Sequence, residues 1–102
     1  MTVKLTVIYD NPTDPEAFEK HYSGEHVKLV PSVPDVQKVE TAKVFPKEDG
    51  SPTPAYRTAD LYFADYDTAV AAISSDAGQK LLADEQDLGS AGVKFLLSDI
   101  GA

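Results

Sequence analysis

The two histidines of the chain, His21 and His26, lie five positions apart in the segment HYSGEH. Imidazole is the side chain that most readily gains and loses a proton near neutral pH, so both residues are candidates for proton transfer. Residues five apart on an ideal helix differ by about 140° in direction, so the pair is not expected to face one metal ion together. Because the chain has no cysteine and no third histidine, we predict no metal site.

His26 is the stronger candidate for chemistry. Phe18, Tyr22 and His26 follow one another at intervals of four residues, so a helix over this segment brings them toward one face. The C-terminal end of a helix favours a protonated imidazole, whereas a neighbouring apolar cavity favours the neutral ring. A pKa balanced near neutrality suits a general acid or base. The alternative interpretation is that His26 only ends the helix by hydrogen bonding to backbone carbonyls.

Three further side chains have a reactive and a structural interpretation. Tyr22 is either a core aromatic or an acid, and Tyr9 either packs in the core or points its hydroxyl into a cleft. His21 is expected at the solvated edge of the helical stripe. The acidic run at residues 84–87 is expected to be a solvated helix end, and no phosphate-binding loop or nucleophile motif is present.

The pattern of apolar residues predicts the elements that hold these side chains. Alternation predicts strands over residues 3–9, 38–45, 56–63 and 93–100, with Val39, Thr41 and Phe45 on one face of the second. Helical spacing predicts helices over residues 15–24 and 64–75, followed by a shorter helical turn over residues 76–85. Asp14, Asp65 and Ser75 are the expected N-caps.

The order of these elements, βαββαβ, indicates an α+β fold of the ferredoxin-like type in a single domain, residues 1–102. Its four-stranded antiparallel sheet has both helices on one face. The opposite face is expected to carry a mixed apolar and polar set, Thr6, Ile8, Tyr56, Thr58, Tyr62, Leu96 and Ser98. Because this surface is too apolar to be left in water, we predict that a second copy of the chain covers it.

The composition narrows the range of partners. Seventeen acidic and nine basic residues give a formal net charge of −8, which disfavours nucleic acid and anionic membranes. No apolar run is long enough for a membrane helix and no signal-like segment precedes residue 3, so we expect a soluble cytoplasmic protein. A small hydrophobic molecule, neutral or weakly acidic, is the expected ligand.

Three segments together resemble the EthD domain, a member of the dimeric α/β-barrel superfamily. They are KLTVIYDNPTDPEAFEKHYSGEHVKLV, ADLYFADYDTAVAAISSDAGQKLLAD and GVKFLLSDI. The most specific pattern is F-x-x-H-Y-x-x-x-H-x-x-L, at Phe18, His21, Tyr22, His26 and Leu29. The resemblance implies a ferredoxin-like protomer, a homodimer whose two sheets close into a barrel, and a small cavity between the helices and the sheet.

The resemblance also implies a range of functions. The namesake of the family belongs to bacterial gene clusters for degrading ethyl tert-butyl ether, and related proteins include cofactor-independent enzymes that act on lactones, polyketides or aromatic acids. The chain is thus expected to be a cofactor-independent oxidoreductase, isomerase or lyase, acting on a small carbonyl or phenolic metabolite in catabolic or secondary metabolism. The alternative is a non-catalytic dimeric protein that binds a small molecule for a degradation pathway.

The resemblance assigns roles to particular residues. The helix-end histidine of the family corresponds to His26, which with Tyr22 forms the expected catalytic pair, and the expected substrate-binding residues are Tyr9, Phe18, His21 and Leu29. Relatives often carry a tyrosine where this chain has Val39, and in some of them it acts as the acid, so Tyr9 or Tyr22 would have to replace it. The chain also lacks the tryptophan on which haem-degrading members of the superfamily generally rely.

Overall fold

The computed structural model describes residues 2–102, so Met1, the first residue of the predicted domain, lies outside it. The strands are β1 (Val3–Tyr9), β2 (Lys38–Lys43), β3 (Arg57–Phe63) and β4 (Val93–Asp99). The α-helices are α1 (Pro15–Gly24), α2 (Tyr66–Ser74) and α3 (Asp76–Leu88), and two short 3-10 helices, η1 (His26–Lys28) and η2 (Val30–Ser32), follow α1. None of the helices described is long and apolar enough to cross a bilayer.

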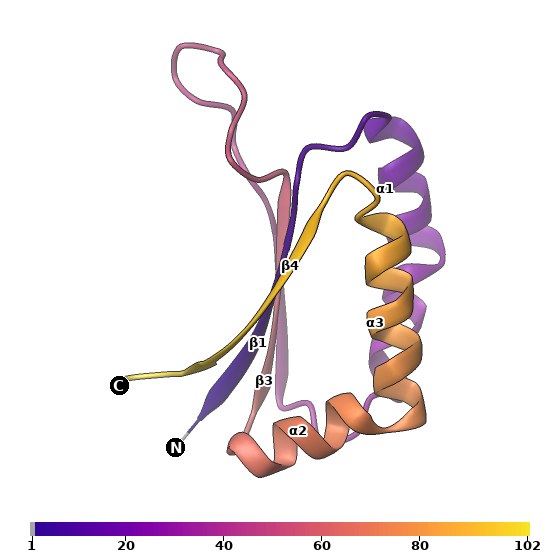
Figure 1. Ribbon diagram of the computed structural model, residues 1–102, viewed down its shortest axis with the longest axis vertical. Coiled ribbons are helices and arrows are strands. Elements are labelled where there is room, and N and C mark those ends of the chain that lie inside the picture. Colours follow the sequence, from indigo (N-terminus) through magenta and orange to yellow (C-terminus); the bar gives the residue numbers. More distant parts are fainter. Residues whose placement is uncertain (1) are drawn as a thin grey trace.

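The four strands form one antiparallel sheet in the order β2-β3-β1-β4. All three α-helices lie on one side of this sheet, with α1 and α3 side by side along it and α2 crossing near one end (Figure 1). The other side is bare. This arrangement confirms the predicted ferredoxin-like α+β fold.

Local capping signals fix where the helices begin. The side chains of Asp14, Asp65 and Ser75 accept hydrogen bonds from backbone N–H groups three residues further on, at 3.1, 2.8 and 3.1 Å respectively, which confirms all three predicted N-caps. The prediction of a short turn after Ser75 is wrong, because α3 has 13 residues and α2 only 9. The helix continues to Leu88 since the buried Leu81 and Leu88 extend its apolar face onto the sheet.

The core lies between the sheet and the helices. The alternating residues of β1 that face the helices, Val3, Leu5, Val7 and Tyr9, are at most 5% exposed. Phe18 and Tyr22 of α1 pack on them from the helical side of the sheet, with their rings stacked and the ring centroids 5.8 Å apart. Burial of this alternating face against a helical stripe supplies the main free energy of folding.

Strand β2 is shorter than predicted. It ends at Lys43, and Phe45, expected on the same face as Val39 and Thr41, is 87% exposed. The last ladder contact is made by Val44, whose N–H donates to the carbonyl of Tyr56 at 2.9 Å. The following Pro46 has no N–H to continue the ladder, and the connection to β3 projects beyond the end of the sheet (Figure 1).

The bare face is more polar than predicted. Tyr56 is not on it: its ring packs edge-on against Phe18 at 5.2 Å, and its hydroxyl donates to Glu19 of α1 at 3.1 Å. On the bare face itself, Asp60 accepts a hydrogen bond from Thr6 and lies 3.8 Å from the ammonium group of Lys4. Its main exposed apolar side chain is Leu96, which is 48% exposed.

Candidate active site

His26 lies at a break between two helices. Helix α1 ends at Gly24, as predicted, and the next turn is the 3-10 helix η1, which begins at His26. The ring of His26 nevertheless continues the aromatic stripe of α1, because it stacks on Tyr22 with centroids 5.3 Å apart. Only 3% of the residue is exposed, so its nitrogens need partners within the protein.

The carboxylate of Asp84, on α3, accepts a hydrogen bond from each of the two histidines. Its Oδ2 lies 2.7 Å from Nδ1 of His26, and its Oδ1 lies 2.8 Å from Nε2 of His21. Since a carboxylate only accepts hydrogen bonds, Nδ1 of His26 carries the proton and donates it toward Asp84. The other nitrogen, Nε2, is left as an acceptor. The interpretation that His26 bonds to backbone carbonyls through its ring is therefore wrong.

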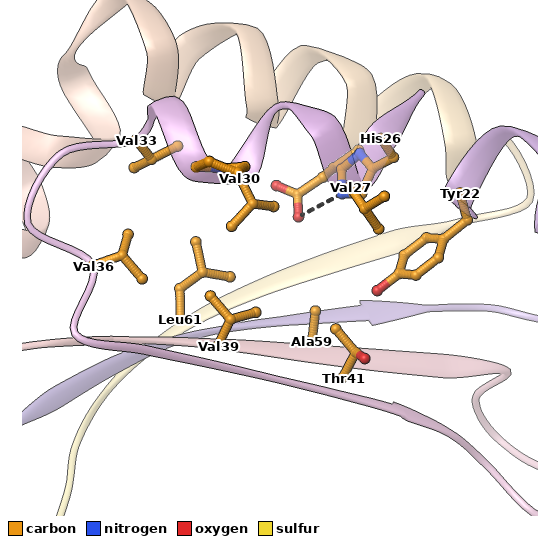
Figure 2. Close-up of a pocket in the computed structure, with 12 residues that line it drawn as sticks. Tyr22, His26, Val27, Val30, Val33, Val36, Val39, Thr41, Ala59 and Leu61 are labelled. Carbon is orange, nitrogen blue, oxygen red and sulfur yellow. Dashed lines mark ion pairs between the residues drawn. The ribbon is translucent and has the colours of Figure 1, made fainter. Parts of the chain in front are cut away.

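Nε2 of His26 faces two acidic groups. The hydroxyl of Tyr9 lies 3.4 Å away, within hydrogen-bonding distance, and Oε2 of Glu85 lies 3.8 Å away (Figure 2, dashed line). Glu85 is only 1% exposed, and its second oxygen, Oε1, has no hydrogen-bond partner among the described residues. His26 thus sits between an orienting carboxylate on one side and a buried carboxyl group and a phenol on the other.

Burial and hydrogen bonding set the charges of His26 and Asp84. Burial lowers the pKa of His26 below its ordinary value, although the hydrogen bond to Asp84 opposes this shift. Partial burial alone would raise the pKa of Asp84, but the hydrogen bonds from His26 and His21 outweigh it and lower that pKa. At neutral pH the pair is therefore a neutral imidazole oriented by an ionised carboxylate, the arrangement in which Nε2 can accept a proton.

The acidic groups beyond Nε2 hold their protons strongly. Burial, assisted by the charge of Asp84, raises the pKa of Glu85 to about 8. Burial and the proximity of Glu85 raise the pKa of Tyr9 far above its ordinary value. The pKa of Tyr22 is also raised by burial, although Arg57, whose guanidinium lies 4.6 Å from the ring centre, opposes the shift. Near pH 7 this side of the site is largely uncharged.

An apolar cavity of about 370 Å³ opens beside His26, between the 3-10 helices and the sheet. Its walls come from η1, η2 and the segment after them on one side and from β2 and β3 on the other (Figure 2). Apart from Tyr22, His26, Thr41 and Glu85, the lining residues are aliphatic: Val27, Val30, Pro31, Val33, Val36, Val39, Ala59 and Leu61. This volume suits a small molecule.

The structure brings only part of the predicted site to the cavity. His26 and Tyr22 line it, and the Tyr22 hydroxyl points toward Thr41 (Figure 2). Tyr9 is fully buried beneath the site and reaches it only through its hydroxyl near His26.

Three other residues that were predicted to bind the substrate do not line this cavity. Phe18 lies in the core, one turn away, with its ring against Tyr9 and Tyr56. His21 points instead toward α3, where it meets Asp84. Leu29 is partly buried against the core, because the 3-10 turns rotate it away from the direction that a continuous α-helix would have given it.

Sequence reasoning missed the contribution of α3. The acidic run was expected to be solvated, but Glu85 is buried and Asp84 is partly buried. A signal for Glu85 was present in the spacing: it follows Leu81 by four residues and precedes Leu88 by three, which places it on the buried stripe of the helix. A carboxyl group on an apolar stripe is unusual enough to mark a functional position.

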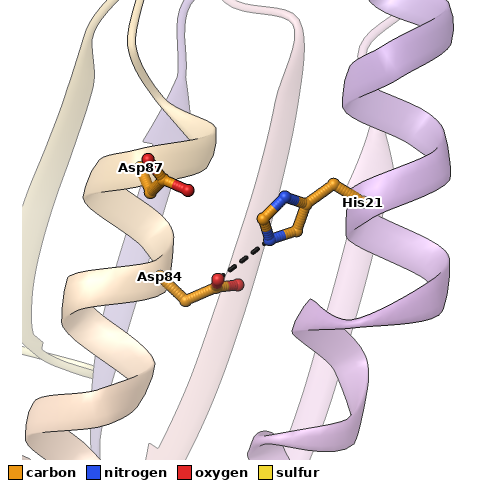
Figure 3. A group of neighbouring side chains, drawn as sticks. All are labelled: His21, Asp84 and Asp87. Carbon is orange, nitrogen blue, oxygen red and sulfur yellow. Dashed lines mark hydrogen bonds and ion pairs between the residues drawn. The ribbon is translucent and has the colours of Figure 1, made fainter.

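One group of side chains in residues 2–102 has the composition of a cation site. His21 of α1 and Asp84 and Asp87 of α3 each offer an atom within 4.8 Å of the others (Figure 3). Both oxygens of Asp84, however, already accept hydrogen bonds from imidazoles. His21 therefore helps to hold Asp84 in place against His26, and we assign no ion to the group.

The raised pKa of Glu85 makes stability depend on pH. The folded state keeps this proton up to about pH 8, whereas an unfolded glutamate loses it near pH 4.5, so stability falls as the pH rises from about 4.5 to about 8 and levels off above that value. Between pH 7 and pH 9 we expect this group to lower the free energy of unfolding by about 1 kcal/mol. Urea denaturation at both pH values measures the change.

The matched control is Glu85→Gln, which removes the titrating group and preserves its shape. His26 contributes little in this range, because its lowered pKa keeps it neutral in the folded state and an unfolded histidine is mostly neutral above pH 7. The variant should lose less stability than the wild type between pH 7 and pH 9. Equal losses in the two proteins would contradict the assignment.

Comparison with known proteins shows which family the chain resembles in sequence and in fold. The model of the EthD domain matches residues 10–88. An uncharacterized 11.0 kDa protein in the thcB-thcC intergenic region of Rhodococcus erythropolis is 40% identical over 96 residues, which cover 94% of this chain and 92% of that protein. The crystal structure of an EthD family protein from Bacillus halodurans superimposes with a TM-score of 0.89 at 22% identity, covering 97% of this chain and 98% of that one.

More distant structures share the fold alone. SnoaB from Streptomyces nogalater, described as a cofactor-independent oxygenase, matches with a TM-score of 0.70 at 12% identity and covers 99% of this chain and 94% of its own. A dimeric ferredoxin-like protein of unknown function from Jannaschia sp. matches with a TM-score of 0.75 at 11% identity, covering 98% of this chain and 100% of its own.

Proposed function

Because the chain belongs to the EthD domain family, whose fold is shared by a cofactor-independent oxygenase, we propose that it is a cofactor-independent enzyme. It moves a proton on a small hydrophobic carbonyl or phenolic compound bound in the cavity. The observation that carries the proposal is the setting of His26: Nδ1 is held by Asp84 at 2.7 Å while Nε2 remains an acceptor beside an apolar cavity.

The geometry assigns His26 the role of general base. Asp84 fixes the ring and its tautomer, and the imidazolium that forms when Nε2 takes a proton is stabilised by the same carboxylate. The stacked ring of Tyr22 fixes the orientation of His26 from the other side, and its hydroxyl and that of Thr41 are positioned to orient an oxygen of the ligand. Aliphatic walls exclude water from the proton transfer.

A direct test is to follow proton exchange at carbon. A panel of uncharged ketones and phenols is incubated with the protein in deuterium oxide, and loss of the proton signals next to the carbonyl or hydroxyl group is followed by NMR. We expect the protein to accelerate exchange for compounds that bind. If compounds of the panel bind but none of them exchanges faster, the result would instead support the alternative, a non-catalytic small-molecule binding protein.

We also propose that the active form is a homodimer. The Jannaschia protein of the same fold is described as dimeric, and the bare face of the sheet here exposes Leu96 of β4, directly opposite Thr6 of β1. A second copy placed sheet against sheet would remove this side chain from water and leave both cavities on the helical sides. The ion pair of Asp60 with Lys4 would remain within the interface.

Replacing Leu96 by lysine tests this interface. A charge placed on the shared surface should raise the dimer dissociation constant by roughly tenfold or more. Light scattering at micromolar concentration measures the mass of the wild type and the variant. The matched control is Val70→Lys, at an exposed valine of α2 on the helical side, which should stay dimeric. A monomeric wild type would refute the homodimer.

A further inference from the structure

Glu85 is the least explained group of the site. It lines the apolar cavity, only 1% of it is exposed, and its Oε1 has no partner among the described residues. A buried oxygen left without a hydrogen bond costs free energy. A side chain of the same shape without charge would fit the stripe of α3 better, so the position calls for an explanation in terms of a bound molecule.

The groups around Glu85 favour its protonated form. Asp84 lies beside it on α3, Tyr9 reaches it from β1, Tyr22 faces it from α1, and Nε2 of His26 lies 3.8 Å from its Oε2. None of them is a cation at neutral pH, since burial keeps His26 neutral. The cavity lining also contains no lysine or arginine. The hydrogen bond from the Tyr9 hydroxyl favours an ionised Glu85, but burial and the charge of Asp84 outweigh it.

We propose that Glu85 is the catalytic acid that complements the base His26, and that the substrate is an uncharged ketone or aldehyde whose carbonyl oxygen accepts a hydrogen bond from the Oε1 hydroxyl of Glu85. This inference rests on the proposed function, because it assigns a second group to the same proton transfer. It also narrows the substrate class, since phenols and carboxylates would not use the acid in this way.

The chemical step is an enolisation that balances without a cofactor. Nε2 of His26 removes a proton from the carbon next to the carbonyl, and the C–H electron pair becomes the new C=C bond. The carbonyl π electrons move to oxygen, which takes the proton of Glu85. The result is an enol, an imidazolium and a carboxylate, and the last two form an ion pair at the observed 3.8 Å. Reversal of these transfers, at the same or a conjugated carbon, restores both groups.

The geometry also predicts what the site rejects. A carboxylate ligand would bring a second negative charge next to Asp84 in a cavity lined by aliphatic side chains and no cation. Such a charge would be left without compensation in a medium of low dielectric constant. Discrimination between a ketone and a carboxylate of equal size is therefore a direct signature of this arrangement.

Acetophenone and benzoate are suitable probes, because they have the same number of non-hydrogen atoms and differ in charge. Binding is measured from NMR shifts of the cavity residues. We expect acetophenone to bind the wild type at least about tenfold more tightly than benzoate at pH 7. Its affinity should fall about tenfold between pH 7 and pH 9 as Glu85 ionises.

The decisive variant is Glu85→Gln, whose amide can donate a hydrogen bond but cannot transfer a proton. It should still bind acetophenone, lose the decrease in affinity between pH 7 and pH 9, and exchange the methyl protons of acetophenone about 10²-fold more slowly. If the variant does not fold, the carboxyl carbon of Glu85 in the ¹³C-labelled wild type should titrate near pH 8.

The outcomes separate the acid from the base. Wild-type exchange in Glu85→Gln, an unchanged pH dependence of its binding, or a Glu85 carbon that titrates at the ordinary value for glutamate would each overturn the acid. Benzoate bound as tightly as acetophenone, or no binding of acetophenone, would overturn the substrate class. The variant His26→Asn should keep the preference for acetophenone while losing exchange; retained exchange there would overturn the base and leave the acid standing.

Discussion

Replacing His26 by asparagine is expected to slow proton exchange on bound ketones by about 10²–10⁴-fold, the usual contribution of a general base. Asparagine keeps a planar polar group whose amide can still donate to Asp84, while giving up the ring that stacks on Tyr22. The loss should appear in kcat, with little change in the dissociation constant of the ketone. Exchange of the methyl protons of acetophenone, followed by NMR in deuterium oxide, provides the measurement.

His21→Asn is the matched control for this variant. It removes the other imidazole that contacts Asp84, at 2.8 Å, but it does not alter the cavity lining. Because His21 only helps to position Asp84, its replacement should cause a much smaller loss of exchange than that of His26. Equal losses in the two variants would contradict the assignment of His26 as the base, as would wild-type exchange in His26→Asn.

The second large effect is expected for Asp84→Asn. The carboxylate now accepts from Nδ1 of His26, whereas an amide can present its N–H groups to that nitrogen and so favour the opposite tautomer, with the proton on Nε2. A protonated Nε2 cannot act as a base. We therefore expect exchange to slow by at least about 10²-fold, since loss of the correct tautomer in a serine protease costs about 10⁴-fold.

The tautomer itself can be observed, which separates positioning from general destabilisation. In the ¹⁵N spectrum of the wild type, Nδ1 of His26 should carry the proton, and in Asp84→Asn the proton should shift to Nε2. Asp87→Asn makes the same chemical change one turn away at an exposed position that does not contact His26, and it should leave both the spectrum and the exchange rate unaltered. An unchanged tautomer in Asp84→Asn would refute the positioning role.

Much of the fold followed from local patterns. Alternation located β1 within its observed bounds, and the caps at Asp14, Asp65 and Ser75 were correct because a capping side chain bonds to the backbone only three residues away. Gly24 was correctly expected to end α1. Errors arose where alternation was extended past the ladder: Phe45 is exposed and Tyr56 lies on the helical side, because strand ends depend on the partner strand.

The candidate site was likewise predictable only in its local part. The sequence by itself determined that His26 follows Phe18 and Tyr22 at helical spacing, and therefore that an imidazole would lie near the core beside an aromatic stripe. It could not determine what that imidazole contacts. Asp84 is 58 positions away along the chain, and no local rule relates residues at such a distance.

Only the tertiary structure decided that both histidines would share one carboxylate. Directions 140° apart on a continuous helix would exclude this, but α1 ends at Gly24 and the tighter turn of η1 redirects His26 toward α3. The packing of α3 against η1 likewise buries Glu85 and raises its pKa. Protonation states of buried groups depend on long-range packing and desolvation, and these exist only once the chain has folded.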